Sequence, residues 1–206
     1  MHPNPIFHTQ DAQANLAFAR SRAFGVLAVA AGDAAPMLSH VPFLLDEDGT
    51  WAHLHLVRSN PIARALRDGP LKARIAVSGP HSYVSPDWYE IDDQVPTWNY
   101  IAVQLTGVLE LRPQEELHDL LDRQSARFET QLLPKTPWTS AKMSDGVMEK
   151  MMRQIVPCAV KVTDVDGTWK MNQNKPDAVR LRAADAVEAN AMGTDTEALA
   201  ALMRNA

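Results

Sequence analysis

The chain has 206 residues, of which 46% are hydrophobic and 22% charged, and its formal net charge is −5 at pH 7. These values are those of one ordinary globular domain, and no apolar run approaches the roughly 18 residues that a membrane-spanning helix needs. The single cysteine, Cys158, excludes an internal disulfide, and the acidic balance excludes a protein whose whole surface holds nucleic acid. The opening "MHPNPIFHTQ" lacks the basic start and apolar core of a signal peptide, so we expect a cytoplasmic protein.

The first half of the chain predicts one helix followed by a series of strands. The spacing of Leu16, Phe18 and Ala19 predicts a helix over residues 11–22. Alternating or apolar runs then predict strands over residues 24–31, 36–45, 50–57, 71–79 and 101–111. The segment "DEDG" predicts a hairpin turn over residues 46–49, whereas Gly79-Pro80 should close a strand and Gly107 should mark a bulge.

The second half is more helical. Helices are predicted over residues 113–128, 144–155 and 176–191, and Thr194 with Glu197 predicts a capping box for a last short helix. Residues 158–171 indicate a strand, an Asp166-Gly167 turn and a second strand. We therefore predict one α+β domain over residues 1–206, built on a small, mostly antiparallel barrel, with residues 176–206 as a C-terminal helical extension.

A candidate anion site lies in "VRSNPIAR", where a strand runs directly into a helix start. Asn60 is a favoured N-cap and Pro61 a favoured first helical residue, so free amides and the helix dipole would meet an anion there. Arg58 and Arg64 flank this start and could add charge-assisted bonds. The alternative is a capped surface helix with two solvated arginines.

Three histidines in neighbouring strands, His40, His53 and His55, raise the question of a metal site. His53 and His55 share a strand face, as a ligand pair would. However, the sequence offers no third ligand motif, no HExxH and no cysteine partner, so we expect polar histidines rather than a metal centre.

Two further segments concentrate side chains that suit a flat ligand. "GPHSYVSPDWY" and "VPTWNY" bring together Trp88, Tyr89, Trp98 and Tyr100, which indicates either core, subunit interface or the wall of a heteroaromatic site. "WKMNQNKP" places three amide side chains in a row between two lysines, which suits the edge of a pyrimidine-like ring or, alternatively, a polar loop. No GxGxxG, GxxxxGK[ST] or GxSxG motif is present.

These segments together resemble one family. "SHVPFLLDEDG", "AHLHLVRSNP", "VSGPHSYVSPDWY", "VPTWNYIAVQLTGVLEL" and "WKMNQNKP" have the order and spacing of the PaiB-like FMN-binding negative transcriptional regulators. The resemblance implies a split β-barrel with flanking helices, a homodimer, and FMN bound where the two subunits meet. It does not include the final helix after Thr194.

The resemblance also implies which residues surround the cofactor. The FMN phosphate would lie at Arg58, Ser59 and Asn60, near Arg64, with Ser39 and His40 of the "SHVP" strand beside the cofactor. Trp98 and Asn99 would line the dimer cleft, and Lys170, Gln173 and Asn174 would close the site. Where the family has a Lys-Leu-Ser-Gln-Asn-like segment, this chain has Asn172 in place of a smaller residue, which changes the shape of that edge.

Three functions follow as alternatives. The first is a flavin-containing repressor, for which the acidic chain would need a local DNA patch, for instance Lys170, Lys175, Arg180 and Arg182. The second is an FMN-dependent oxidoreductase of the flavin reductase or pyridoxamine-phosphate oxidase type, with a nicotinamide or small redox substrate and no specific acid or base. The third is a haem-binding or haem-degrading split barrel with a histidine such as His40 or His55 on the iron. We expect the first, without direct DNA contact.

Overall fold

The computed structural model describes residues 2–206, which form two compact units by their contacts. Unit 1 combines the chain up to Phe18 with Val77–Gln104 and Val165–Ala206, and unit 2 combines Ala19–Ala76 with Leu105–Asp164. Each unit therefore contains segments that are far apart in the sequence.

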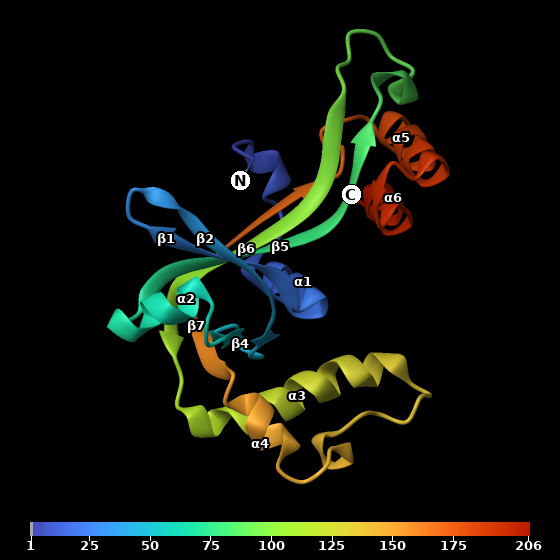
Figure 1. The fold of residues 1–206 in the computed structure, drawn as a ribbon. Helices are drawn as coiled ribbons and strands as arrows, with labels where there is room; N and C mark the ends of the chain where they lie inside the picture. Colours follow the sequence, from blue (N-terminus) through green and yellow to red (C-terminus); the bar gives the residue numbers. More distant parts are fainter. Residues whose placement is uncertain (1) are drawn as a thin grey trace. The chain divides into compact units, whose positions relative to one another are not determined.

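Most strands lie in the first half of the chain and most α-helices in the second half (Figure 1). The strands are β1 (Phe24–Ala31), β2 (Ala34–Pro42), β3 (Leu44–Leu45), β4 (Trp51–Val57), β5 (Leu71–Val84), β6 (Thr97–Leu111), β7 (Ile155–Lys170) and β8 (Gly193–Thr194). The α-helices are α1 (Ala12–Arg22), α2 (Pro61–Ala65), α3 (Leu117–Glu129), α4 (Val147–Met152), α5 (Asp177–Asn190) and α6 (Thr196–Arg204). Short 3-10 turns are η1 (Pro5–Phe7), η2 (Leu66–Asp68), η3 (Pro86–Tyr89), η4 (Gln114–Glu116), η5 (Thr130–Leu132) and η6 (Ser140–Lys142).

The strands form one eight-stranded sheet in the order β2-β1-β5-β6-β7-β4-β3, with β8 paired to β5. The pairs of β1 with β2 and β5, of β4 with β3 and β7, and of β5 with β8 are antiparallel. Three long strands, β5, β6 and β7, contribute residues to both units. The predicted α+β class with a mostly antiparallel sheet is confirmed.

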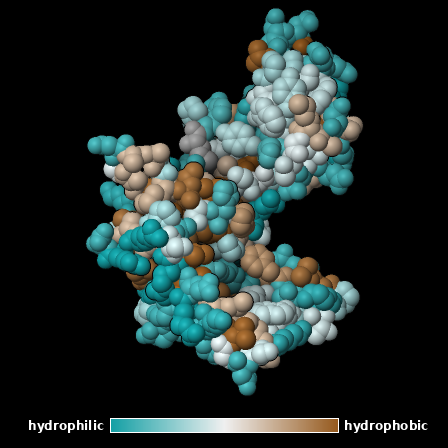
Figure 2. Space-filling view, viewed as in Figure 1, coloured by the Kyte–Doolittle hydropathy of each residue, from teal (hydrophilic) through white to brown (hydrophobic). Residues whose placement is uncertain are grey.

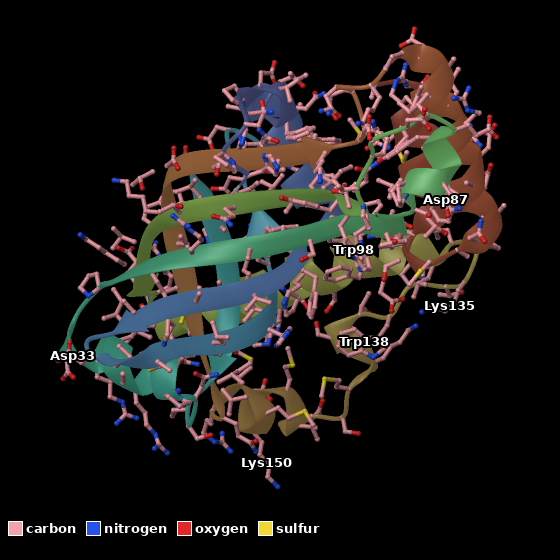
Figure 3. All side chains as sticks on the ribbon, turned by 90° about the horizontal axis from the view of Figure 1, so that it is seen from above. Asp33, Asp87, Trp98, Lys135, Trp138 and Lys150 are labelled. Atoms are coloured by element: carbon pink, nitrogen blue, oxygen red, sulfur yellow. The ribbon has the colours of Figure 1, made fainter. Side chains whose placement is uncertain are left out.

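Unit 2 contains two hairpins, of which the sequence predicted the one that turns over residues 46–49. β1 and β2 pair from Phe24 with Pro42 onward, and Asp33 lies at the tip of this hairpin (Figure 3). The turn over residues 46–49 joins β3 to β4 as expected, with the Asp46 amide bonded to the Trp51 carbonyl at 2.9 Å. Alternation in β4 buries Leu54 and Leu56 and leaves Val57 exposed, which is the pattern of a strand with one face in the core.

Unit 1 has its own core, in which the C-terminal helices take part. The cluster includes Val84, Tyr89, Ile101 and Trp169 together with residues of both last helices. α5 and α6 lie side by side (Figure 1), and α6 buries Leu199, Ala200 and Met203 at a helical spacing. The segment after Pro176 is therefore part of the core of unit 1.

Two glycines that were expected to end or bend strands have another role. β5 continues through Gly79-Pro80 to Val84, and a Cβ at Gly79 would lie 2.5 Å from Phe18 Cζ. β6 runs unbroken over Gly107, where a Cβ would lie 2.0 Å from the Lys161 carbonyl oxygen. Both glycines allow close packing between neighbouring elements. The predicted strand end at Gly79 is wrong.

The predicted turn at Asp166-Gly167 is also wrong. β7 passes through it as one strand, because the space that a Gly167 side chain would fill holds the Asn15 side chain, with Oδ1 1.9 Å from the Cβ position. Asn15 in turn accepts a 2.8 Å hydrogen bond from Trp169 Nε1. Gly167 was therefore needed for helix packing, although Asp-Gly on its own is a turn signal.

The helix ends in the last third differ from the predictions as well. α4 covers only Val147–Met152, and Ile155 already belongs to β7. The last helix is capped by Asp195, whose φ is 50° and whose side chain makes no capping bond, so the Thr194–Glu197 capping box is absent. Within residues 2–206, none of the helices combines the length and apolarity that crossing a bilayer requires.

Candidate functional site

The predicted phosphate residues lie in unit 2, where the helix start expected at Asn60 is present. α2 begins at Pro61 with Asn60 as its N-cap, and Asn60 Oδ1 accepts the Ile62 amide at 2.9 Å. The cap therefore uses one of the amides that could otherwise meet an anion. Ser59 and Arg64 are exposed beside it. Within residues 2–206, the Arg64 side chain has neither a hydrogen bond nor an ion pair, so its guanidinium is free for a ligand.

Asn60 also connects α2 to the "SHVP" strand. Its Nδ2 donates to Ser39 Oγ at 3.2 Å, which brings β2 next to the start of α2. His40, the next residue on β2, is exposed, and its ring stacks on Phe24 with centroids 6.4 Å apart and planes inclined by 29°. Ser39 and Asn60 therefore meet in unit 2, with Ser59 and Arg64 beside Asn60 at the start of α2. His40 follows Ser39 on the same strand, so its side chain points to the opposite face of β2, toward Phe24.

Arg58 is less free than the sequence suggested. Its Nε donates to the Arg153 carbonyl at 3.0 Å, and its Nη2 donates to the Ile155 carbonyl and to Gln114 Oε1, both at 3.2 Å. These bonds tie the end of β4 to the start of β7. Most of the guanidinium fork thus holds the backbone, and a phosphate would meet only the remaining donors.

The two histidines of β4 have partners in unit 2. His53 Nε2 lies 3.2 Å from Asp46 Oδ1 across the β3–β4 hairpin. Burial lowers the pKa of His55, and a side-chain hydrogen bond with Gln124 partly offsets this. Among residues 2–206, no three His, Cys, Asp or Glu side chains gather closely enough to hold a metal ion.

The other predicted residues belong to unit 1, and Trp98 is the most accessible of the aromatic ones. Its side chain is 47% exposed on β6 (Figure 3), with its ring 5.9 Å from that of His81 and 6.3 Å from that of Tyr83. Tyr83 also meets Trp88 edge-on. An exposed indole supported by further rings suits contact with a flat heteroaromatic group.

Asn99 does not line a cleft, which corrects the prediction. Successive strand residues point to opposite faces, so the neighbour of the exposed Trp98 turns inward, and Asn99 is 0% exposed. Its Nδ2 donates to Met203 Sδ of α6 at 3.5 Å, while its Oδ1 has no partner among the described residues. The final helix, which the resemblance did not include, covers this amide.

The three amide side chains of "WKMNQNKP" also differ in their exposure. Asn172 is 2% exposed with a φ of 61°, and its Oδ1 accepts from Tyr89 Oη at 3.3 Å. Gln173 uses its amide on the turn itself, accepting from the Met171 amide at 2.7 Å and donating to the Trp169 carbonyl at 2.5 Å. Only Asn174 is exposed. Of the two alternatives that the sequence left open, a ligand edge or a polar loop, the contacts of Asn172 and Gln173 favour the polar loop for these two residues.

The cations of this region also have partners inside unit 1. Lys170 Nζ donates to Thr97 Oγ1, and burial lowers the pKa of this lysine. Lys175 bonds to Gln94 and lies over the Tyr89 ring. Arg180 is buried against the Met203 carbonyl, and Arg182 pairs with Glu90 and the Tyr89 carbonyl. The basic segment that DNA contact would need is thus committed to internal contacts.

Exposed apolar side chains are present in both units. In unit 2, Phe24 and Leu38 of β1 and β2 are 52% and 62% exposed, and Figure 2 shows hydrophobic atoms among hydrophilic ones over this hairpin. In unit 1, Ile91, Val95 and Met192 are exposed together with Trp98. Such residues are typical of surfaces that contact a partner or a ligand.

Comparison with known proteins finds a family model and several similar proteins. The family model described as "Putative FMN-binding domain" matches residues 1–164. The protein "Protease synthase and sporulation protein PAI 2" of Bacillus subtilis (strain 168) is 25% identical over 207 residues, which cover 100% of this chain and 97% of that protein. An uncharacterized protein of Aspergillus fumigatus is 29% identical over 205 residues, covering 76% of this chain and 78% of that protein.

Solved structures resemble the fold at low sequence identity. The FAD and heme binding protein of Mycobacterium smegmatis superposes with a TM-score of 0.57 at 15% identity, covering 83% of this chain and 77% of that one. The flavocytochrome Anf3 of Azotobacter vinelandii gives a TM-score of 0.53 at 12% identity, covering 82% and 72%. At these identities the likeness concerns the fold alone.

Proposed function

Because the chain belongs to the FMN-binding domain family whose model matches residues 1–164, we propose that it is a PaiB-like flavoprotein that acts in negative regulation of transcription. The family match is the observation that carries the proposal, and it confirms the predicted family and its FMN cofactor. The proposal includes a cytoplasmic homodimer of the split-barrel type with FMN where two subunits meet. The regulatory role rests on the resemblance and on the full-length match to the Bacillus subtilis protein.

The phosphate of FMN would be held in unit 2. Ser59 and Arg64 offer an exposed hydroxyl and an unpaired guanidinium, and Asn60 orients both by capping α2 and bonding to Ser39. This donor set fits a dianionic phosphate, because charge-assisted bonds from arginine and hydroxyl donors are those that phosphate favours. Arg58 would contribute through its remaining donors while it holds β4 to β7.

Unit 1 also contains side chains whose chemistry would suit a flavin ring. The exposed Trp98 offers a flat apolar face, and Asn174 and Lys170 offer polar groups at the turn after β7. Bound flavin supplies redox chemistry of its own, and the protein contributes binding and orientation. Asn99 is excluded from this set by its burial under α6.

The homodimer is supported by the exposed apolar residues of the β1–β2 hairpin. Phe24 and Leu38 together expose apolar area beside His40, a residue that we place at the cofactor. A subunit interface would remove that area from water.

A second candidate function is an FMN-dependent oxidoreductase of the flavin reductase or pyridoxamine-phosphate oxidase type. The observation that favours it is that Lys170, Lys175, Arg180 and Arg182 all make contacts within unit 1, which reduces the number of cationic donors that this segment could offer to DNA. Oxidation of NADH or NADPH by the purified protein with added FMN would distinguish this function from a purely regulatory one.

The decisive experiment compares FMN with riboflavin, which lacks the phosphate. We expect FMN to bind about tenfold to a hundredfold more tightly, since one charge-assisted bond contributes about 1.5–3 kcal/mol. Arg64→Ala should remove most of this advantage and leave riboflavin binding unchanged. Arg67→Ala is the matched control, because Arg67 is an exposed arginine one turn further on. Equal dissociation constants for the two flavins in the wild type would refute the phosphate site.

A further inference from the structure

The N-terminal segment of unit 1 packs on the turn that follows β7. Gln173 Nε2 donates to the Ile6 carbonyl at 3.2 Å, and Lys170 Nζ lies 5.9 Å from the centre of the Phe7 ring. His8 Nδ1 lies 3.2 Å from Asp166 Oδ1 near the end of β7. Residues 2–8, which we name the strap, thus contact residues 166–173 at three points.

The strap has an ordered structure of its own. Asn4 caps η1 by accepting the Ile6 amide at 3.0 Å, and His8 Nε2 lies 2.5 Å from the His2 carbonyl oxygen. The His2 ring meets the Phe7 ring edge-on with centroids 4.6 Å apart, and Phe7 is only 4% exposed. An anchored aromatic ring and a capped turn give the strap a fixed shape, so its contacts with the turn have a defined geometry.

Gln173 is the residue that joins the strap to the turn. A primary amide has two N–H donors, and both are used in this structure, one on the Trp169 carbonyl and one on the Ile6 carbonyl. Its Oε1 accepts from the Met171 amide at 2.7 Å. Gln173 therefore cannot direct a donor at a flavin without giving up a bond that shapes the turn.

The opposite side of the turn is held by other residues. Lys170 bonds to Thr97, and the Tyr89 hydroxyl bonds to Asn172, whose left-handed backbone lets the chain reverse. The Lys175 amide closes the turn on the Asn172 carbonyl at 2.9 Å. The strap supplies the remaining support, and Asn174 is the residue that the turn leaves exposed.

From these contacts we propose that Gln173 is a positioning residue for the flavin site and that the strap is part of that site's framework. Strap docking fixes the backbone of residues 170–174, and so fixes where Lys170 and Asn174 present their polar groups. This inference rests on the proposed FMN function and deepens it. By linkage, FMN must also stabilise the docked strap, since docking and binding favour the same arrangement.

The experiment uses Gln173→Leu, which keeps the volume and removes all three bonds. Two readouts are needed: hydrogen exchange of the strap amides without flavin, and the FMN dissociation constant. We expect strap protection to fall at least tenfold and the dissociation constant to rise at least tenfold. Gln131→Leu is the matched control, because Gln131 is a glutamine whose Nε2 also bonds to a carbonyl, that of Arg127, outside the proposed site.

A second variant loosens the strap without touching the turn. Asp166→Asn removes the charge that faces His8 and keeps the side-chain size, so strap protection and FMN affinity should fall together, by less than in Gln173→Leu. Falling FMN affinity with full strap protection in Gln173→Leu would mean that Gln173 contacts the flavin directly, and this would overturn the proposal. Unchanged FMN affinity with a released strap would overturn it as well. Absence of FMN binding in the wild type would refute the proposed function, whereas strap release in Gln173→Leu would still be measured by exchange.

Discussion

Unit 2 presents its predicted ligand-binding side chains to solvent, whereas unit 1 uses most of its own for internal contacts. Ser59 and Arg64 of unit 2 are exposed, while Asn99 and Asn172 of unit 1 are 0% and 2% exposed. The units differ in charge too, since unit 1 has eleven acidic and five basic residues and unit 2 has fourteen and fifteen. An anionic phosphate therefore meets a more favourable field in unit 2.

Buried polar groups sharpen this contrast. Within residues 2–206, four buried side-chain atoms of unit 1 have no hydrogen-bond partner, against two in unit 2, His55 Nδ1 and Gln124 Nε2. The four are Asn99 Oδ1, Thr168 Oγ1, Asn172 Nδ2 and Arg182 Nε, of which the last lies in an ion pair with Glu90. Each such group costs roughly 1–3 kcal/mol relative to a satisfied one. Unit 1 thus contains buried polar groups beneath its C-terminal helices. We therefore expect substitutions there to change the stability of the fold, whereas substitutions at the predicted ligand-binding residues of unit 2 should change FMN binding.

The largest expected effect concerns the reactivity of Cys158, which reports on unit 2 alone. Burial raises the pKa of this thiol from 9.0 to about 12, and the side chain is 0% exposed on β7. The raised pKa makes the thiolate fraction at pH 8 about a thousandfold smaller than in the unfolded chain. Only the thiolate reacts, so the labelling rate falls with this fraction. Iodoacetamide labelling followed by mass spectrometry should be slower in native protein by at least this factor. Rapid labelling without denaturant would show that unit 2 opens readily.

Two glycine substitutions, one in each unit, should lower the free energy of unfolding by different amounts. Gly107→Ala places a methyl group 2.0 Å from the Lys161 backbone oxygen in unit 2, and Gly167→Ala places one 1.9 Å from the Asn15 side chain in unit 1. We expect losses of about 3 and about 2 kcal/mol in urea unfolding, since a side chain yields more easily than a paired strand. Only Gly107→Ala should also accelerate Cys158 labelling. Equal acceleration by both variants would mean that the units open together.

Two asparagine substitutions should have opposite consequences. Asn60→Ala removes the α2 cap and the bond to Ser39, so it should cost about 1 kcal/mol and weaken FMN binding. Asn99→Leu replaces a poorly paired buried amide with an apolar group of similar size, so stability should stay equal or rise by up to about 1 kcal/mol. Its FMN affinity should equal that of the wild type by fluorescence titration. A clear loss of FMN affinity in Asn99→Leu would place this amide at the cofactor.

The pH dependence of stability should contain a contribution from His55. Burial lowers its pKa in the folded protein, so the unfolded chain binds more protons in the interval below the ordinary histidine value of about 6.5. Stability from this group is complete above that value and falls as the pH decreases toward the folded pKa. Urea unfolding between pH 7.5 and about 5 should show a shallower decline for His55→Gln than for the wild type. An identical decline would show that His55 is not a source of the pH dependence.

We expect the purified protein to show no specific binding to DNA. The cations that could form a DNA patch are bonded within unit 1, which carries the larger negative charge. Gel shifts with the gene's own upstream DNA should show no specific complex at about 150 mM salt, where screening already weakens non-specific binding. A competitor-resistant shift in the nanomolar range would contradict this, and its loss in Lys72→Ala/Arg74→Ala would place DNA on the basic strand β5 of unit 2.

The sequence by itself determined the elements whose signals are local. Alternation located β1 and β4 almost to the residue, the segment over residues 46–49 formed the hairpin turn, and Asn60-Pro61 began α2. The same local pattern placed Ser59, Asn60 and Arg64 together, and the spacing of the quoted segments indicated the FMN-binding family. These features depend on residues that are neighbours in the chain, so periodicity and capping chemistry suffice to predict them.

Only the tertiary structure decided what the distant segments do to one another. Gly167 allows Asn15 to pack on a continuous β7, Asn99 is covered by α6, and Gln173 bonds to Ile6 from 167 residues away. Asp-Gly predicted a turn, and the amide row left a ligand edge and a polar loop open, because sequence patterns describe only the backbone's local preference and the chemistry of a side chain. The space next to a side chain is filled by residues of other elements, and these residues also supply its hydrogen-bond partners. Both depend on packing between elements that are far apart in the sequence.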